Sequence, residues 1–205
     1  MSLFDPVSFS LSEAEAELDT FKRWFRTVGF VRENVIVAEI RKRPHMTCLL
    51  GPTGSIAAPN LMCWELGLGG LFRTDLVIGN DAKREFTLVE FEGAGEASLF
   101  GKARTRQYRA WSGELEHGFG QLIDWACYQA HNLRDAALRD NFGGEIRRTT
   151  YLLICGRDAG IVGQAERERF DFRRTAVSVQ GVPAQVLTYD EMVAAMTDNL
   201  EIWRG

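Results

Sequence analysis

The chain has 205 residues, of which 45% are hydrophobic and 25% are charged, enough for one globular domain with a complete core. Its net charge of -4 and isoelectric point near 5.5 argue against a protein that binds nucleic acid through overall positive charge, but they allow a local basic patch. The sequence shows neither the pattern of a signal peptide nor an apolar stretch long enough to span a membrane. We therefore expect a cytoplasmic protein with no membrane contact.

Two helices are predicted near the N-terminus. Ser10 and Ser12 each begin a capping-box pattern, and Gly29 ends the first helix. Apolar residues recur in it at helical spacing: Leu18, Phe21, Phe25 and Val28. A second helix is predicted over Glu33 to Lys42, and Pro44 is expected to stop it.

A loop rich in Gly and Pro at residues 51–60 follows these helices. We therefore predict a helical segment at residues 1–59 packed on a core domain at residues 60–205. The core strands are expected at 61–68, 71–78, 86–92 and 148–157, and the helices at 113–132, 134–141 and 161–172. A last strand runs into a C-terminal helix through a capping box at Thr188–Glu191. This order predicts an α/β (α+β) fold, with a mixed central sheet flanked by helices.

The cysteines are scattered, without the paired spacing of a zinc site: Cys48, Cys63, Cys127 and Cys155. Three of the four lie in apolar runs. We expect buried free thiols in a reducing compartment.

Three acidic residues stand in the two apolar runs Phe72–Asn80 and Glu85–Gly93. Side chains alternate along a strand, so Glu90 and Glu92 point to the same face, and an antiparallel hairpin can bring Asp75 opposite them. Buried carboxylates are costly unless they are paired or bind a metal. Oxygen ligands suit a hard cation, so the pattern predicts a site for Mg²⁺ or Mn²⁺ among the three carboxylates.

An ion pair is the competing interpretation of the same acids. Arg73 lies two residues before Asp75 and is close enough in sequence to pair with either glutamate. On the hairpin alone, a metal site and a structural ion pair are about equally supported.

The order of these segments resembles the PD-(D/E)XK nuclease superfamily and, more narrowly, the nuclease domain of Shedu antiphage defence proteins. The matching stretches are FRTDLVI, TLVEFEGA, WSGELEHGFGQLIDW, LLICGR and VLTYDEM. The resemblance implies metal binding by Asp75 and Glu90, a catalytic role for Glu92, and a catalytic glutamine at Gln121. It also implies a homo-oligomer, for which the apolar C-terminal helix is one possible interface.

The chain departs from the family pattern at Glu92, where the usual motif has Lys. A glutamate there can accept a proton from the attacking water or add a metal ligand. His117 lies one turn before Gln121 on the same helix face and is a possible accessory residue, with a structural role equally supported. The resemblance further implies an accessory glutamate from the N-terminal helix, with Glu17 the leading candidate beside Glu13 and Glu15.

A basic segment follows the acidic strand and holds Lys102, Arg104, Arg106 and Arg109. Phosphate contacts are expected there on the strength of the resemblance. Composition alone favours a solvated loop.

The resemblance, together with the acidic cluster, predicts a metal-dependent endonuclease that hydrolyses DNA, and the role in prokaryotic antiviral defence is implied by the resemblance alone. The alternative is an inactive nuclease-fold protein that binds nucleic acid or serves in assembly, which the acidic composition and Glu92 favour. A third hypothesis is a nuclease that acts on RNA.

Overall fold

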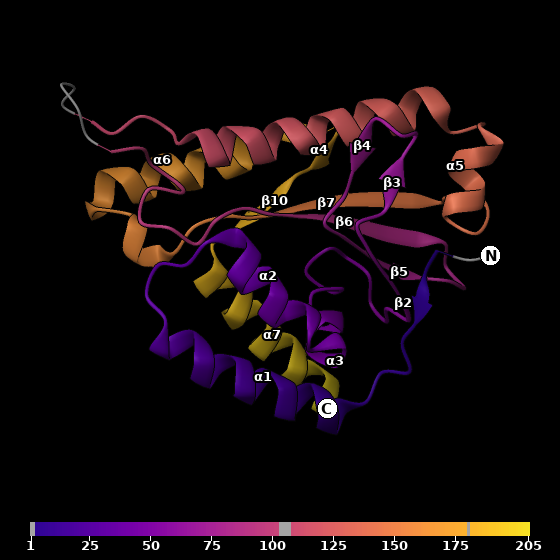
Figure 1. The fold of residues 1–205 in the computed structure, drawn as a ribbon, viewed down its shortest axis with the longest axis horizontal. Helices are drawn as coiled ribbons and strands as arrows, with labels where there is room; N and C mark the ends of the chain where they lie inside the picture. The colour runs from indigo at the N-terminus through magenta and orange to yellow at the C-terminus, as the bar shows by residue number, and fades with distance from the viewer. Residues whose placement is uncertain (1–2, 103–107, 180) are drawn as a thin grey trace.

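A six-stranded mixed sheet forms the centre of the molecule (Figure 1). The computed structural model describes residues 3–102, 108–179 and 181–205. The strands lie in the order β1 (Asp5–Pro6), β2 (Leu61–Trp64), β5 (Leu76–Asn80), β6 (Glu85–Phe91), β7 (Arg148–Ile154) and β10 (Gln185–Leu187). The pairs from β1 to β6 are antiparallel, while β6–β7 and β7–β10 are parallel. The predicted fold class is confirmed.

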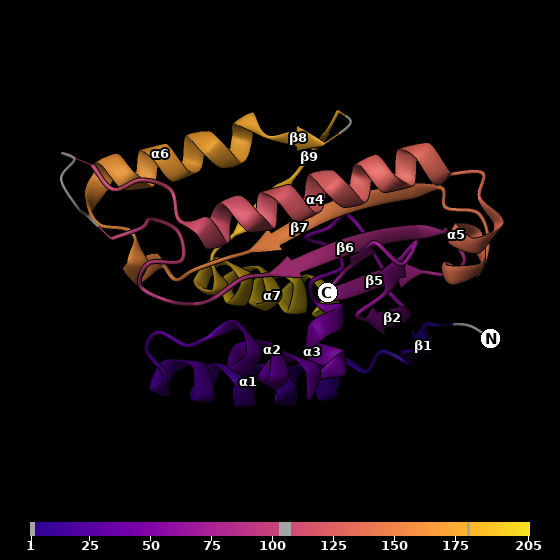
Figure 2. The same cartoon turned by 45° about the horizontal axis from the view of Figure 1, so that its top comes forward.

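Helices cover both faces of this sheet (Figure 2). One face carries α1 (Leu11–Thr27), α2 (Glu33–Arg41), α3 (Pro44–Cys48) and α7 (Tyr189–Arg204). The other face carries α4 (Gly113–Asn132) and α6 (Gly163–Ala176), and α5 (Ala136–Asn141) packs at the end where β6 begins. The alternation of β6 sorts its side chains between the two layers, since Val89 and Phe91 join the first core and Phe86 and Leu88 the second.

The strands predicted at 61–68 and 71–78 are each interrupted. Glu65 has a φ of 57°, which ends β2 and turns the chain. Beyond this turn, β3 (Gly67–Leu68) pairs with β4 (Phe72–Arg73) as a separate ribbon. Pro44 ends α2 as expected, but it also begins α3, where a missing N–H costs nothing. The structure adds β8 (Ser178–Val179), β9 (Val182–Pro183) and the short 3-10 helix at Asp158–Gly160, none of which the sequence patterns predicted.

The N-terminal helices share a core with the sheet. Leu18 and Phe21 of α1 and Ile36 of α2 belong to the same buried cluster as Val89 and Phe91 of β6. The amide of Glu13 donates to Ser10, so the first of the two predicted caps is the one used. No helix among the described residues combines the length and the apolar character needed to cross a bilayer.

The apolar face of α7 packs inside the molecule. Met192, Met196 and Leu200 are buried in the cluster that holds α1 and the sheet. The interpretation of this face as a subunit interface was therefore wrong, because its side chains already have intramolecular partners.

We expect Met196→Ala to lower the free energy of unfolding by about 2–5 kcal/mol, since it leaves a cavity in a closed core. Ile202→Ala on the same helix is the control, because Ile202 is 72% exposed and its loss should stay within about 0.5 kcal/mol. Urea denaturation measures both. If Met196→Ala kept its stability and changed the oligomeric state instead, the apolar face of α7 would be an interface between subunits.

Candidate active site

The pairing of β5 with β6 brings the first two acids together. Leu76 lies opposite Val89, so Asp75, one residue before β5, faces Glu90. An oxygen of Asp75 accepts a hydrogen bond of 2.8 Å from the Phe91 amide, and its carboxyl also bonds to that of Glu90. The structure shows the expected meeting of Asp75 with Glu90 across the hairpin, whereas the ligand atoms that lie within 4.8 Å of one another belong to Glu90, Glu92 and His117.

Glu92 joins the cluster from the end of β6. Glu90 and Glu92 are only 6% and 5% exposed, and both point to the side covered by α4. His117 of α4 lies over them, with its Nδ1 2.7 Å from Oε1 of Glu92. One ligand atom from each of Glu90, Glu92 and His117 lies within 4.8 Å of the other two. Gln121 follows, with its Nε2 3.3 Å from Nε2 of His117.

Two residues let α4 and α7 close on this cluster. A Cβ at Gly118 would lie 2.4 Å from Cδ1 of Leu153 and 3.2 Å from Cγ of Glu92, so only glycine permits this approach of α4. From the opposite face, the buried hydroxyl of Tyr189 donates to the carbonyl of Glu92 at 2.7 Å. The HGFG and TYDE segments thus hold the end of β6 from both sides.

The nearest cation in sequence does not neutralise these acids. The guanidinium of Arg73 points to Glu65, with an N···O distance of 3.9 Å. The ion-pair interpretation of the hairpin is therefore wrong in its choice of partner. Among the described side chains, the one that contacts these acids directly and can carry a positive charge is His117.

Burial and mutual repulsion change how the acids titrate. Burial, followed by the charges of Asp75 and Glu92, raises the pKa of Glu90 to about 10. Burial also raises the pKa of Asp75, and it raises the pKa of Glu92 against the opposing hydrogen bond from His117. The metal-free site therefore retains protons at neutral pH, and a bound cation would take their place.

Glu33 is a site residue that sequence reasoning missed. It begins α2 at the mouth of the cluster, where surrounding protein and the charges of Asp75 and Glu114 raise its pKa. A β-bridge between Val31 and Ala94 fixes the start of α2 beside the end of β6, with N–H···O distances of 3.2 and 3.1 Å. Nothing local in the sequence marks Glu33, because this bridge joins segments far apart along the chain.

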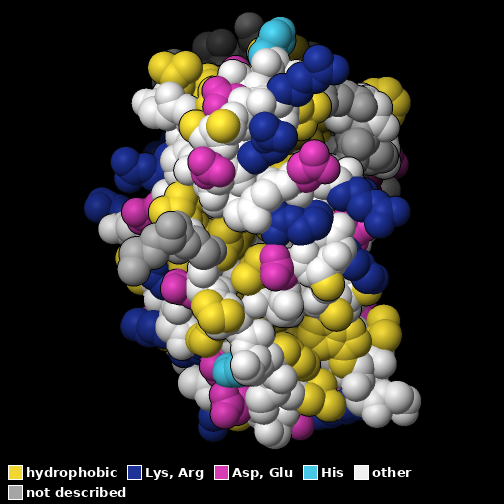
Figure 3. Space-filling model, turned by 90° about the vertical axis from the view of Figure 1, so that its right-hand side faces the viewer, with side chains coloured by type: hydrophobic (Ala, Val, Ile, Leu, Met, Phe, Trp, Pro, Cys, Tyr) yellow, Lys and Arg dark blue, Asp and Glu magenta, His cyan; other side chains and the backbone are white. Residues whose placement is uncertain are grey.

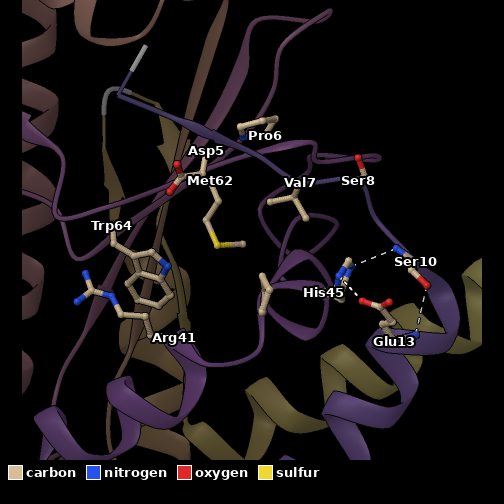
Figure 4. A pocket seen from close by; sticks show the side chains of 11 residues that line it. Asp5, Pro6, Val7, Ser8, Ser10, Glu13, Arg41, His45, Met62 and Trp64 are labelled. Carbon is tan, nitrogen blue, oxygen red and sulfur yellow. Dashed lines mark hydrogen bonds and ion pairs between the residues drawn. The ribbon is translucent and has the colours of Figure 1, made fainter. Parts of the chain in front are cut away.

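The accessory glutamates expected on α1 are engaged elsewhere. Their partners are His45 for Glu13, Arg204 for Glu15 and the Met46 amide for Glu17. Figure 4 shows the first pair in a separate cavity of about 800 Å³, where Nε2 of His45 lies 2.6 Å from Glu13 and the Ser10 amide donates to Nδ1. The glutamate of the N-terminal helices that lies near the acids is Glu33 of α2.

The basic segment is described only in part. Lys102 is exposed, whereas Arg104 and Arg106 lie outside the described residues. Arg109 pairs with Glu166, with Nε 2.7 Å from the carboxylate, and donates to the Gly160 carbonyl at 2.6 Å. Its guanidinium holds the start of α6, so Arg109 is a structural residue and not a free phosphate contact.

A family model described as "Shedu protein SduA, C-terminal" matches residues 26–193. The chain belongs to the Shedu family. The match covers every residue of the cluster, including Glu33, His117 and Gln121, and it begins after Glu13 and Glu17. A search of curated proteins found no match to this Shedu chain.

The free energy of unfolding of the metal-free protein should depend on pH, because the acids titrate. In the unfolded state Glu90 loses its proton as the pH rises through about 4.5, the ordinary pKa of a glutamate. In the native state the raised pKa keeps this proton bound at higher pH. Stability should therefore fall as pH rises from about 5 to 9, by up to about 1.4 kcal/mol per pH unit for each such proton. Glu90→Gln should flatten this slope and stabilise the metal-free protein at pH 8, as measured by urea unfolding in a chelator.

Glu116→Gln is the matched control on α4. The hydrogen bond from Arg173 lowers the pKa of Glu116, so its titration is complete below this range and the slope should not change. An identical slope for Glu90→Gln and the native chain would show that Glu90 is ionised in the metal-free site.

Proposed function

We propose that this Shedu protein is a metal-dependent nuclease that hydrolyses DNA phosphodiesters in antiviral defence. The observation that carries the proposal is the meeting of buried Glu90 and Glu92 with His117 and with half-buried Asp75, where no arginine or lysine among the described residues pairs with the acids. Burying several carboxylates destabilises a fold, and a divalent cation offsets that cost. Family membership supports a nuclease-like role in defence.

The donor set fits a hard divalent cation. Asp75 and Glu90 would hold Mg²⁺ or Mn²⁺, with Glu92 beside them and Glu33 at the entrance. When bound, the cation lowers the pKa of a water and stabilises charge that develops on the phosphate. Burial restricts the Glu90 carboxyl, and its partner Asp75 is itself held by the Phe91 amide.

Glu92 and His117 form a pair suited to accept a proton. If Nδ1–H of His117 donates to Glu92, Nε2 is the basic nitrogen of the ring, and its lone pair accepts from the Gln121 amide until a water takes that place and gives up its proton. The carboxylate then stabilises the imidazolium, and the amide of Gln121 positions the ring through its contact with Nε2. Glu92, at the position where the usual motif has Lys, thus acts by orienting His117 and stabilising its protonated form.

An inactive protein that binds nucleic acid or serves in assembly is the second candidate. Its support is the Glu92 departure together with the net charge of -4. A cleavage assay on DNA and on RNA, each with Mg²⁺ or Mn²⁺, separates the candidates. Cleavage of neither substrate by the native chain favours the inactive protein, and cleavage of RNA alone changes the substrate. A homo-oligomer is likewise proposed from the family, through a surface other than the buried face of α7.

Mn²⁺ should stabilise the native chain against unfolding by about 2.7 kcal/mol at one hundred times its dissociation constant. Asp75→Asn should lose most of this effect, because it removes one charge and one ligand from the cluster. Asp124→Asn is the control, since Asp124 is exposed on α4 and has no partner among the described side chains. Equal Mn²⁺ stabilisation of all three proteins would place the metal elsewhere.

His117→Ala should lower the rate of DNA cleavage by roughly 10²- to 10⁴-fold, the usual effect of removing a general base. His131→Ala, an exposed histidine on the same helix, should cut at the native rate. The rates are measured with plasmid DNA at saturating Mn²⁺. If His117→Ala cleaves at the native rate, the histidine takes no part in proton transfer. If His117→Ala no longer binds Mn²⁺, the histidine is a metal ligand.

A further inference from the structure

A continuous groove crosses the loop that follows β6. Two cavities of about 400 and 540 Å³ both include Gly95, Ser98 and Glu114, so they meet at this loop. The first extends to the start of α2, and the second extends to Lys102. Both cartoons place the loop from β6 to α4 at the same end of the molecule as the start of α2 (Figures 1 and 2).

The sign of charge changes twice along this groove. Arg32 stands at one end and Lys102 at the other, whereas Glu33 and Glu114 lie between them. Glu96 is a further acid near the Lys102 end. A phosphate is attracted to the two ends and repelled from the middle, unless a cation is bound there.

The two terminal cations are free to bind a ligand. Arg32 and Lys102 are exposed, and neither side chain makes a hydrogen bond or ion pair with another residue that the structure describes. Arg109, which lines the groove beside Lys102, is held by Glu166. On the end of the molecule that carries α5, by contrast, Lys and Arg side chains are interspersed with Asp and Glu (Figure 3).

Two glycines of the loop let the side chains of Glu114 and Ser98 pack against its backbone. A Cβ at Gly93 would lie 2.5 Å from Oε2 of Glu114, so a side chain there would displace that carboxylate. The Gly95 amide donates a hydrogen bond of 2.8 Å to the hydroxyl of Ser98, which is buried. Glu114 is therefore the acid that a bound chain meets at the middle of the groove.

We propose that this groove holds the sugar-phosphate strand that is to be cut, with Arg32 and Lys102 binding phosphates on either side of the scissile one. The cations at the two ends set the path of the strand, and Glu33 and Glu114 between them lie close enough to the cluster for their charges to act on Glu92. The inference rests on the proposed function for the identity of the central phosphate. The path along the groove follows from the cavities and the unpaired cations.

Binding measured without divalent metal tests the path separately from cleavage. The native chain, Arg32→Ala, Lys102→Ala and the double variant are titrated with a fluorescent single-stranded oligonucleotide and with the matching duplex at several salt concentrations. Each lost contact should reduce the salt slope of the binding constant by about 0.7 on a single strand or about 0.9 on a duplex. The substrate on which both single variants show this loss is the form that enters the groove.

Lys83→Ala is the matched control, because Lys83 is exposed in the β5–β6 turn and its side chain has no partner among the described residues. It should keep the native affinity and slope. A double variant that binds like the native chain overturns the path, even if the protein cuts DNA. If the variants lose salt slope and the native chain cuts no nucleic acid, the path is supported and the proposed function is wrong. No binding to either form overturns the path.

Discussion

The antiparallel pairing of β5 with β6 is the constraint on which the candidate site depends. The register that places Leu76 opposite Val89 also places Asp75 opposite Glu90, and it turns Glu90 and Glu92 toward α4. A slip of one residue would send the glutamates into the apolar layer of α1 and α7. The same register buries Glu90 and Glu92 beside half-buried Asp75, a costly arrangement that the surrounding packing must hold in place.

Both helical layers share that task. On one side, Gly118 lets α4 approach close enough for His117 to reach Glu92. On the other side, Tyr189 at the start of α7 bonds to the carbonyl of Glu92 and closes the end of β6. The backbone of the cluster is thus held from both sides, while its carboxyl groups keep protons when no cation is bound. Sites that bind metals and substrates commonly keep such local instability within a stable frame.

The N-terminal helices belong to the site as well as to the fold. Their apolar faces complete the core beneath the sheet, and the Val31–Ala94 bridge sets the start of α2 beside the acids. Glu33 and Arg32 reach the groove for this reason. A helical segment that looks separable in the sequence thus supplies one wall of the opening, and the division at residue 59 remains a prediction.

The sequence by itself determined the elements whose evidence is local. Strand alternation put Glu90 and Glu92 on one face, and helical spacing put His117 beside Gln121. The turn at Glu65, the partner of Arg73 and the engagement of Arg109 with Glu166 came only with the tertiary structure. The same holds for the nearness of Glu33 to the acids. These features depend on contacts between segments far apart in the chain, and the spacing of residues within one element carries no information about which distant segment it will meet.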